Sequence, residues 1–207
     1  MLVVVLAVVA VLAPAGLAGA QTTTEVPVSG TFTATGDISD CGRGPGIARF
    51  VFDGTGDLAP FGPTESRFDV CTDASGGVDP TPIVSGSTFT ITAAGGTLTG
   101  DVTGTGSSFS PTPQGFPFHN ILTVTGGTGV FSGATGTLFN DGFVNLASTG
   151  PLLRSTATVS GTLILQSLTP HSKAECKKGG WRNLANDQGQ PFRNQGQCVS
   201  YVVSKRK

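Results

Sequence analysis

Residues 87–103, STFTITAAGGTLTGDVT, hold two short runs in which threonine alternates with apolar residues or glycine. Successive side chains of an extended strand point to opposite faces, so each run gives its strand an apolar face and a threonine face. The glycine pair Gly95-Gly96 between the runs favours a tight turn. The stretch therefore predicts two strands joined by a turn.

Strands of this kind fill most of the chain. Eight segments have strand length and strand composition, at residues 28–35, 47–53, 66–72, 87–92, 97–103, 120–125, 136–145 and 155–166. Glycine-rich spacers separate them, and in this part of the sequence no segment carries apolar residues at helical spacing over helical length. Seven or eight short strands without helices predict an all-β sandwich or a closed barrel.

The first twenty residues have the layout of a secretory signal peptide. Residues 2–12 are an unbroken run of Leu, Val and Ala, and Ala18-Gly19-Ala20 supplies the small residues of a cleavage site. The run is too short for a permanent membrane span, although no Lys or Arg precedes it. We predict a signal peptide over residues 1–20 and a secreted protein, with a retained membrane anchor as the alternative.

The charges divide the remaining chain into two parts. Residues 21–168 hold four basic and eleven acidic residues, a net charge of −7, whereas residues 169–207 hold eight basic and two acidic residues, a net charge of +6. The glycine- and threonine-rich pattern ends at the same place. The sequence therefore predicts a β-barrel domain over 21–168 and a basic C-terminal cassette over 169–207.

The four cysteines predict disulfides. An even number of cysteines in an exported chain favours disulfides over metal or redox chemistry, and four cysteines allow three pairings. We favour Cys41–Cys71 and Cys176–Cys198, because each pair then lies within one part of the chain. No Cys-x-x-Cys occurs, so no metal site is expected.

The basic cassette has two helix-start signals. Ser172 and Glu175 have the spacing of a capping box, and Asn194 can cap a second helix that carries Cys198. The sequence predicts a small helical module tied by a disulfide, because so short a segment builds only a minimal core.

Common catalytic motifs are absent from the sequence. Val124-Thr125-Gly126-Gly127-Thr128-Gly129 approaches a dinucleotide-binding turn, but its glycine spacing fails and a β-favouring segment follows it instead of a helix. No hydrolase motif occurs. We therefore expect no cofactor, no nucleic-acid partner and no catalytic residue of a common class.

The stretch from Thr125 to Gly136 resembles the GGTG-x-F-x-GA-x-G signature of allene oxide cyclase-like and dirigent-like barrels, and residues 92–100 resemble the hairpin that precedes it in bacterial members. The resemblance implies an eight-stranded antiparallel barrel that often self-associates. It also implies a structural turn at Gly126, Gly127 and Gly129. Plant enzymes of this type hold apolar ligands, but their polar pocket residues have no counterparts here.

A second resemblance covers most of residues 175–203. The pattern CKKGGW followed by NQGQCVSYV is similar to a cassette found at the C-terminus of exported proteins of Gram-positive bacteria. Its recurrence implies a portable accessory. Its positive charge has two explanations: binding to an anionic cell-envelope polymer or membrane surface, or docking on the acidic barrel.

Four polar residues are candidates for a ligand pocket. By alternation, Arg67 and Asp69 share one face of their strand, and Arg49 can meet Asp69 across the ladder. Such a cluster either faces inward and orients a ligand or forms an exposed charged face. His119 lies at the entry to a strand, without an Asp or Ser partner nearby in sequence. It is either an acid or base at the barrel rim or an exposed loop residue.

These patterns predict a secreted, non-catalytic barrel that binds a ligand or a surface partner. An isomerase or cyclase acting on an apolar small molecule inside the barrel is the first alternative. A self-associating structural protein of the cell envelope is the second. The content of the barrel interior distinguishes them, because a filled interior leaves no room for a small molecule.

Overall fold

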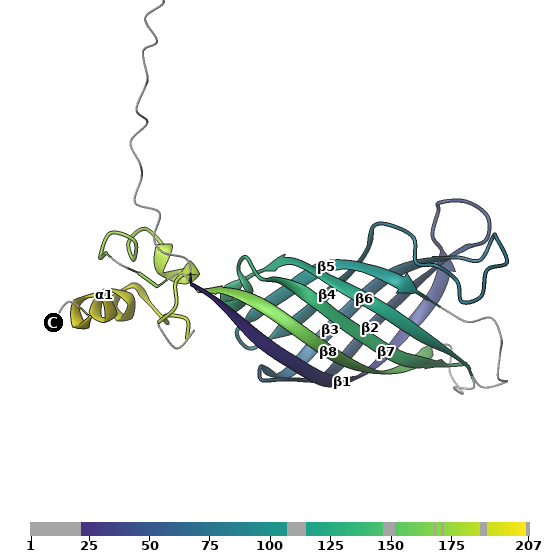
Figure 1. Ribbon diagram of the computed structural model, residues 1–207, viewed down its shortest axis with the longest axis horizontal. Coiled ribbons are helices and arrows are strands. Elements are labelled where there is room, and N and C mark those ends of the chain that lie inside the picture. Colours follow the sequence, from purple (N-terminus) through teal and green to yellow (C-terminus); the bar gives the residue numbers. More distant parts are fainter. Residues whose placement is uncertain are drawn as a thin grey trace, which may run out of the picture.

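The computed structural model of the chain describes residues 22–106, 115–146, 152–167, 169–170, 172–186 and 190–205. Within them, eight antiparallel strands form one closed barrel, in which β8 pairs back with β1 (Figure 1). The strands are β1 (Thr22–Asp40), β2 (Ile47–Ala59), β3 (Gly62–Asp73), β4 (Ser87–Ala93), β5 (Gly96–Thr105), β6 (Gly115–Gly127), β7 (Thr135–Asn145) and β8 (Leu153–Ser167). The predicted all-β class and eight-stranded antiparallel barrel are confirmed, and the sandwich is excluded. The predicted signal peptide lies outside the described residues.

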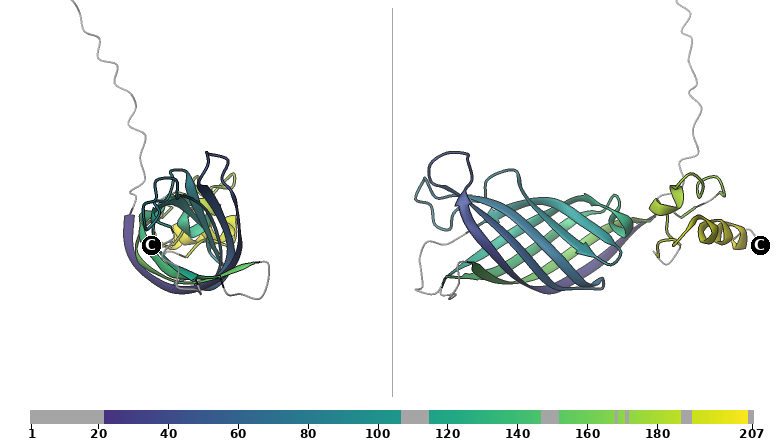
Figure 2. Two further views of the ribbon diagram at one scale, coloured as in Figure 1. Left: turned by 90° about the vertical axis from the view of Figure 1, so that its right-hand side faces the viewer. Right: turned by 180° about the vertical axis from the view of Figure 1, so that it is seen from behind.

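Every predicted strand is present, and most are longer than predicted. β1 extends well beyond residues 28–35, because its first residues pair with β8 and its last residues pair with β2. Backbone hydrogen bonds hold these extensions, so their composition need not be strand-like. The long strands make the barrel a tube instead of a shallow ring (Figures 1 and 2).

The two ends of the tube differ. At one end, which we call the closed end, lie the start of β1, the end of β8 and the turns at residues 60–61, 94–95 and 128–134. At the other end, the mouth, lie the connections 41–46 and 74–86. Side chains fill the interior toward the closed end, where Leu58, Leu98, Leu138 and Leu163 are fully buried.

A glycine-rich turn shuts the closed end. Its 3-10 helix η1 (Gly129–Phe131) donates a hydrogen bond from Val130 N to Gly95 O in the neighbouring hairpin. Gly129 has a φ of 60°, and a Cβ atom there would collide with the same carbonyl oxygen, so the position requires glycine. Phe131 and Ala134 then point into the barrel core. The turn and the hairpin thus form one closed floor.

The cassette packs a second, smaller hydrophobic core at the closed end (Figure 1). It contains the 3-10 helix η2 (Gly180–Asn183), which lies against η1, and the helix α1 (Gln195–Ser204). The core combines Leu184, Phe192 and Val202 with the disulfide between Cys176 and Cys198.

Both predicted disulfides are confirmed. Cys41 pairs with Cys71, and Cys176 pairs with Cys198. Each bridge joins residues within one of the two hydrophobic units, which is the reason the pairing was predictable.

The helix predicted at Ser172 is wrong, whereas the helix capped by Asn194 is confirmed. Ser172 Oγ donates to Glu175 Oε1 at 2.8 Å, yet residues 173–179 form turns instead of a helix. Lys178 and Gly179 adopt left-handed conformations (φ 52° and 86°), and they end the segment before a helix can propagate. Asn194 Oδ1 accepts a hydrogen bond from the Gln197 amide at 2.9 Å, as expected for an N-cap.

Candidate functional site: a cavity inside the mouth

The mouth half of the barrel contains a cavity. Its volume is about 60 Å³, measured as the space open to the centre of a water molecule. One water needs roughly 10–15 Å³ by this measure, so the cavity accommodates about four to six non-hydrogen atoms without movement of its walls. The closed half is packed with side chains, and the interior is therefore neither completely filled nor completely hollow.

Six phenyl rings line the cavity. Alternation along the strands turns the following rings inward: Phe32, Phe50, Phe52, Phe68, Phe116 and Phe118. Phe50 and Phe116 meet edge to face with centroids 6.0 Å apart. Such aromatic pairs contribute about 0.5–1.5 kcal/mol beyond the area that they bury. The wall is thus apolar and internally supported.

Glycines on neighbouring strands leave room for these rings. A Cβ atom at Gly56 would lie 2.7 Å from Phe32 Cδ1, and one at Gly36 would lie 2.6 Å from Phe52 Cδ1. Both distances are far below an ordinary carbon–carbon contact, so a larger residue would displace the ring. The high glycine content therefore serves the aromatic lining as well as the turns.

Five polar side chains interrupt the apolar wall: Ser66, Thr72, Asn120, Asn140 and Ser155. Asn120 on β6 and Asn140 on β7 are direct neighbours across the ladder, and both point inward. Ser66 lines the cavity from β3, four strands away from β7 around the barrel and therefore on the opposite wall. None of these residues was predicted from the sequence to be a site residue. Asn120 lies two positions from Leu122, and Asn140 two positions from Leu138, so each asparagine shares the inward face of its strand with a leucine. This spacing is the signal that could have identified the asparagine pair.

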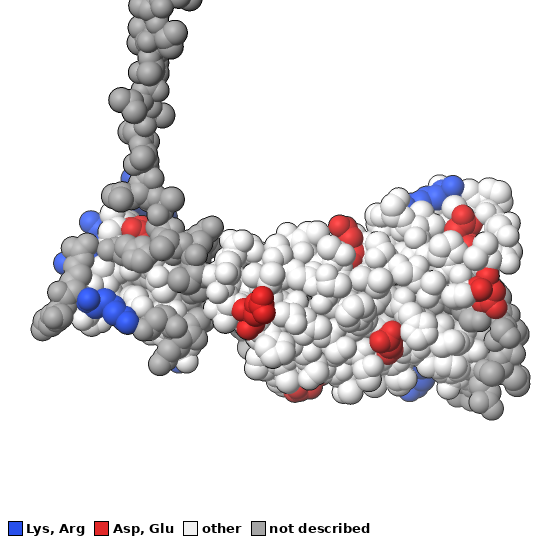
Figure 3. Space-filling model, in the orientation of Figure 1, with Lys and Arg blue, Asp and Glu red and all other residues white. Residues whose placement is uncertain are grey.

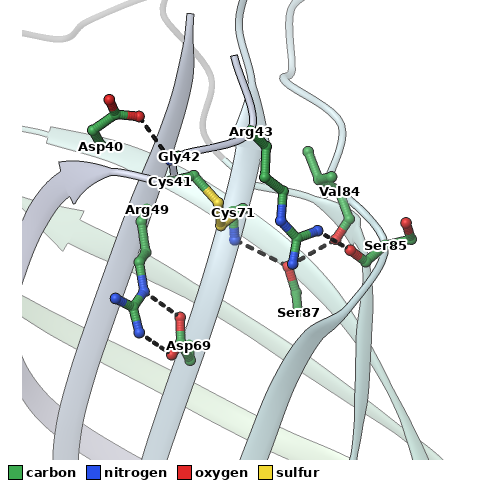
Figure 4. The surroundings of a disulfide bond; sticks show 10 residues. All are labelled: Asp40, Cys41, Gly42, Arg43, Arg49, Asp69, Cys71, Val84, Ser85 and Ser87. Carbon is green, nitrogen blue, oxygen red and sulfur yellow. Dashed lines mark hydrogen bonds and ion pairs between the residues drawn. A yellow bond between two sulfur atoms is a disulfide. The ribbon is translucent and has the colours of Figure 1, made fainter. Parts of the chain in front are cut away.

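The predicted pocket residues Arg49, Arg67 and Asp69 lie on the outer surface and do not line the cavity. Arg49 donates from Nε and Nη2 to the Asp69 carboxylate at 2.8 and 2.5 Å (Figure 4). Arg67 pairs with Asp53 at 2.7 Å. They face outward because the other face of the same strands carries the buried phenyl rings. Of the two arrangements considered for this cluster, the exposed charged face is the one present.

The Arg49–Asp69 contact shifts the pKa values of both side chains. Hydrogen bonding to the guanidinium holds the pKa of the Asp69 carboxyl below its usual range, and the same hydrogen bond raises the pKa of Arg49. The pair is therefore ionised over the whole neutral range. It supports the outer face of the β2–β3 ladder and does not touch the cavity.

His119 also faces outward, with 69% of its side chain exposed. It has a partner that its sequence neighbours do not reveal, because Nδ1 lies 2.9 Å from Asp141 Oδ1. The two residues are opposite each other in the β6–β7 ladder, 22 positions apart in sequence. Neither residue lines the cavity.

The Cys41–Cys71 disulfide stabilises the rim of the mouth (Figure 4). It ties the connection after β1 to β3, and the Cys71 amide donates to Ser87 Oγ at the start of β4 at 2.9 Å. Arg43 donates to the carbonyl oxygen of Ser85 in the next connection. Two strands and two loops are thereby joined beside the cavity.

Basic side chains gather on the cassette, while carboxylates are scattered over the barrel (Figure 3). Lys173, Lys177, Lys178 and Arg193 are all exposed. Arg182 is also exposed, and its guanidinium carbon lies 5.3 Å from the centroid of the Trp181 ring. The charge division predicted from sequence is therefore also a division in space.

Comparison with protein-family models, curated protein sequences and solved structures gives no significant match to this chain. Among the described residues, no group of three or more potential His, Cys, Asp or Glu metal ligands occurs. In that same part of the chain, none of the helices has the length and apolar character needed to cross a bilayer.

Proposed function

We propose that this protein binds a small apolar molecule inside the mouth half of the barrel and does not transform it. The observation that carries the proposal is the cavity itself, with its six phenyl rings and its position beside a braced rim. Concave, mostly apolar sites with a few polar groups are the usual form of small-molecule sites. The resemblance to allene oxide cyclase-like barrels supports the same ligand class.

The chemistry of the wall favours binding over isomerisation or cyclisation. Proton transfer requires a titratable group within hydrogen-bond reach of the substrate. No titratable side chain occurs among the described residues that line the cavity. The charged candidates Arg49 and Asp69 are engaged with each other outside the barrel.

A secreted location fits the same proposal. Two disulfides are typical of proteins that fold in an oxidising, extracellular-type environment. Together with the signal-peptide pattern and the cassette resemblance, they support a role outside a bacterial cell.

The proposal is tested by filling the cavity. Ala157 lines it from β8, whereas the neighbouring Thr156 faces the outside. We expect Ala157→Leu to abolish binding of n-pentane and 1-pentanol, which match the cavity in size, in an NMR titration of the purified protein. Thr156→Leu is the matched control and should bind both probes like the wild type. Equal binding by both variants would place the probes elsewhere and refute the proposal.

A second function is proposed for the cassette, on the basis of its exposed cations. Lys173, Lys177, Lys178 and Arg193 form a surface suited to an anionic polymer of the cell envelope. Retention of the protein on isolated cell walls should fall with increasing salt and disappear when residues 169–207 are deleted. Retention that survives the deletion would refute this function without affecting the cavity proposal.

A further inference from the structure

Three buried polar groups face one apolar cavity without hydrogen-bond partners. Asn140, Ser66 and Asn120 are 3%, 6% and 8% exposed. Within the described part of the chain, Asn120 Oδ1, Asn140 Oδ1 and Ser66 Oγ have no partner. An unsatisfied buried polar group destabilises the folded protein, so three around one space indicate a site that binds a polar group.

Their positions give the cavity a direction. Along β6 the inward residues from the mouth are Phe116, Phe118, Asn120 and Leu122. The asparagine pair therefore lies below the phenyl rings and directly above the packed, fully buried leucine layer. A ligand that satisfies the asparagines places its polar group innermost and its hydrocarbon among the rings toward the mouth.

The cavity also favours an uncharged ligand over a charged one. None of the described lining residues is charged. Burying an unpaired carboxylate or ammonium is far more costly than burying a hydroxyl that is hydrogen-bonded. A hydroxyl donates its one proton to an oxygen of the asparagine pair, and its own oxygen can accept a hydrogen bond from a side-chain amide of the pair.

We propose that the cavity recognises a slender neutral alcohol, whose hydroxyl is held by Asn120 and Asn140 and whose hydrocarbon lies among the phenyl rings. This inference rests on the proposed binding function and adds the chemical class of the ligand. Its specificity comes from hydrogen bonds that an alkane cannot make and from a desolvation cost that a carboxylate cannot avoid.

The test compares three probes of equal chain length, n-pentane, 1-pentanol and pentanoate, by NMR titration of the whole protein. We expect 1-pentanol to bind at least as tightly as pentane, although pentane is the more hydrophobic. Pentanoate should not bind at neutral pH. The side-chain amide signals of Asn120 and Asn140 should shift with pentanol and stay in place with pentane.

The variant Asn140→Leu separates recognition from structural support. It should lower the affinity for pentanol about tenfold, as expected for one lost hydrogen bond, and raise the affinity for pentane. It should also raise the thermal midpoint of the free protein, because it removes an unsatisfied buried group, whereas loss of a structural asparagine would lower the midpoint. Thr137→Leu, on the exposed outer face of the same strand, is the control.

The outcomes distinguish this inference from the function on which it rests. If none of the probes binds, the binding function itself fails. If pentane binds more tightly than pentanol and Asn140→Leu changes neither affinity, the binding function stands and the alcohol inference is overturned. A lowered thermal midpoint in Asn140→Leu would assign the asparagine to folding and also overturn the inference.

Discussion

Replacement of Phe131 by alanine tests whether the glycine-rich turn closes the barrel. The ring is 1% exposed and packs edge to face on Phe61 with centroids 4.8 Å apart. Truncating a buried phenylalanine costs about 3–5 kcal/mol of unfolding free energy, as lost transfer energy plus the cavity that remains. The Phe61 contact accounts for about 0.5–1.5 kcal/mol of this loss.

The assay is urea denaturation followed by circular dichroism. With a denaturant slope of about 2 kcal/mol/M, the Phe131→Ala loss lowers the urea midpoint by about 2 M. Phe139→Ala removes the same ring from the outer face, where the residue is 49% exposed, and should cost under about 1 kcal/mol. If the two variants lose the same stability, Phe131 does not act as a packed plug and the account of the closed end is incorrect.

Three further outcomes are expected. Asp69→Asn should destabilise the protein at neutral pH, because only ionised Asp69 is stabilised by Arg49. The difference in stability should disappear as the pH falls below about 3.9 and through the lowered folded-state pKa; a difference that persists in acid would exclude this cause. Replacing both Cys41 and Cys71 by alanine should cost about 3–4 kcal/mol of unfolding free energy, the loop-closure value for a separation of 30 residues, and an unchanged urea midpoint would contradict it. Asn194→Ala should speed amide exchange in α1 by about fivefold, matching the roughly 1 kcal/mol that an N-cap contributes; unaltered exchange would show that the cap is dispensable.

The eight strands were predictable because their period-two pattern is local. The face that each strand turns inward was harder to assign. In β3, Arg67 and Asp69 share one face while Ser66 and Phe68 share the other, and the sequence alone presents the charged face as a candidate site. The alternation of Phe68 and Val70 marks the inward face of this strand and therefore places Arg67 on the outside.

The contents of the cavity depend on contacts that are remote in sequence. Asn120 and Asn140 meet only because β6 and β7 pair in one register, and His119 meets Asp141 for the same reason. The pairing of two neighbouring strands can be guessed from a hairpin, but the register cannot, because the turn at residues 128–134 includes η1. The alternation of Asn120 with Leu122 was visible in the sequence and was the available indication of a buried polar group.

Both chain ends of the barrel leave from the same side, because Thr22 pairs with Ser167 at the closed end. A reporter domain, an affinity label or a solid support attached at either end of the barrel would therefore leave the mouth unobstructed. The connections 41–46 and 74–86 could likewise be exchanged without affecting the floor. The barrel is in this sense a directional container, which can be immobilised by its base and given new selectivity at its opening.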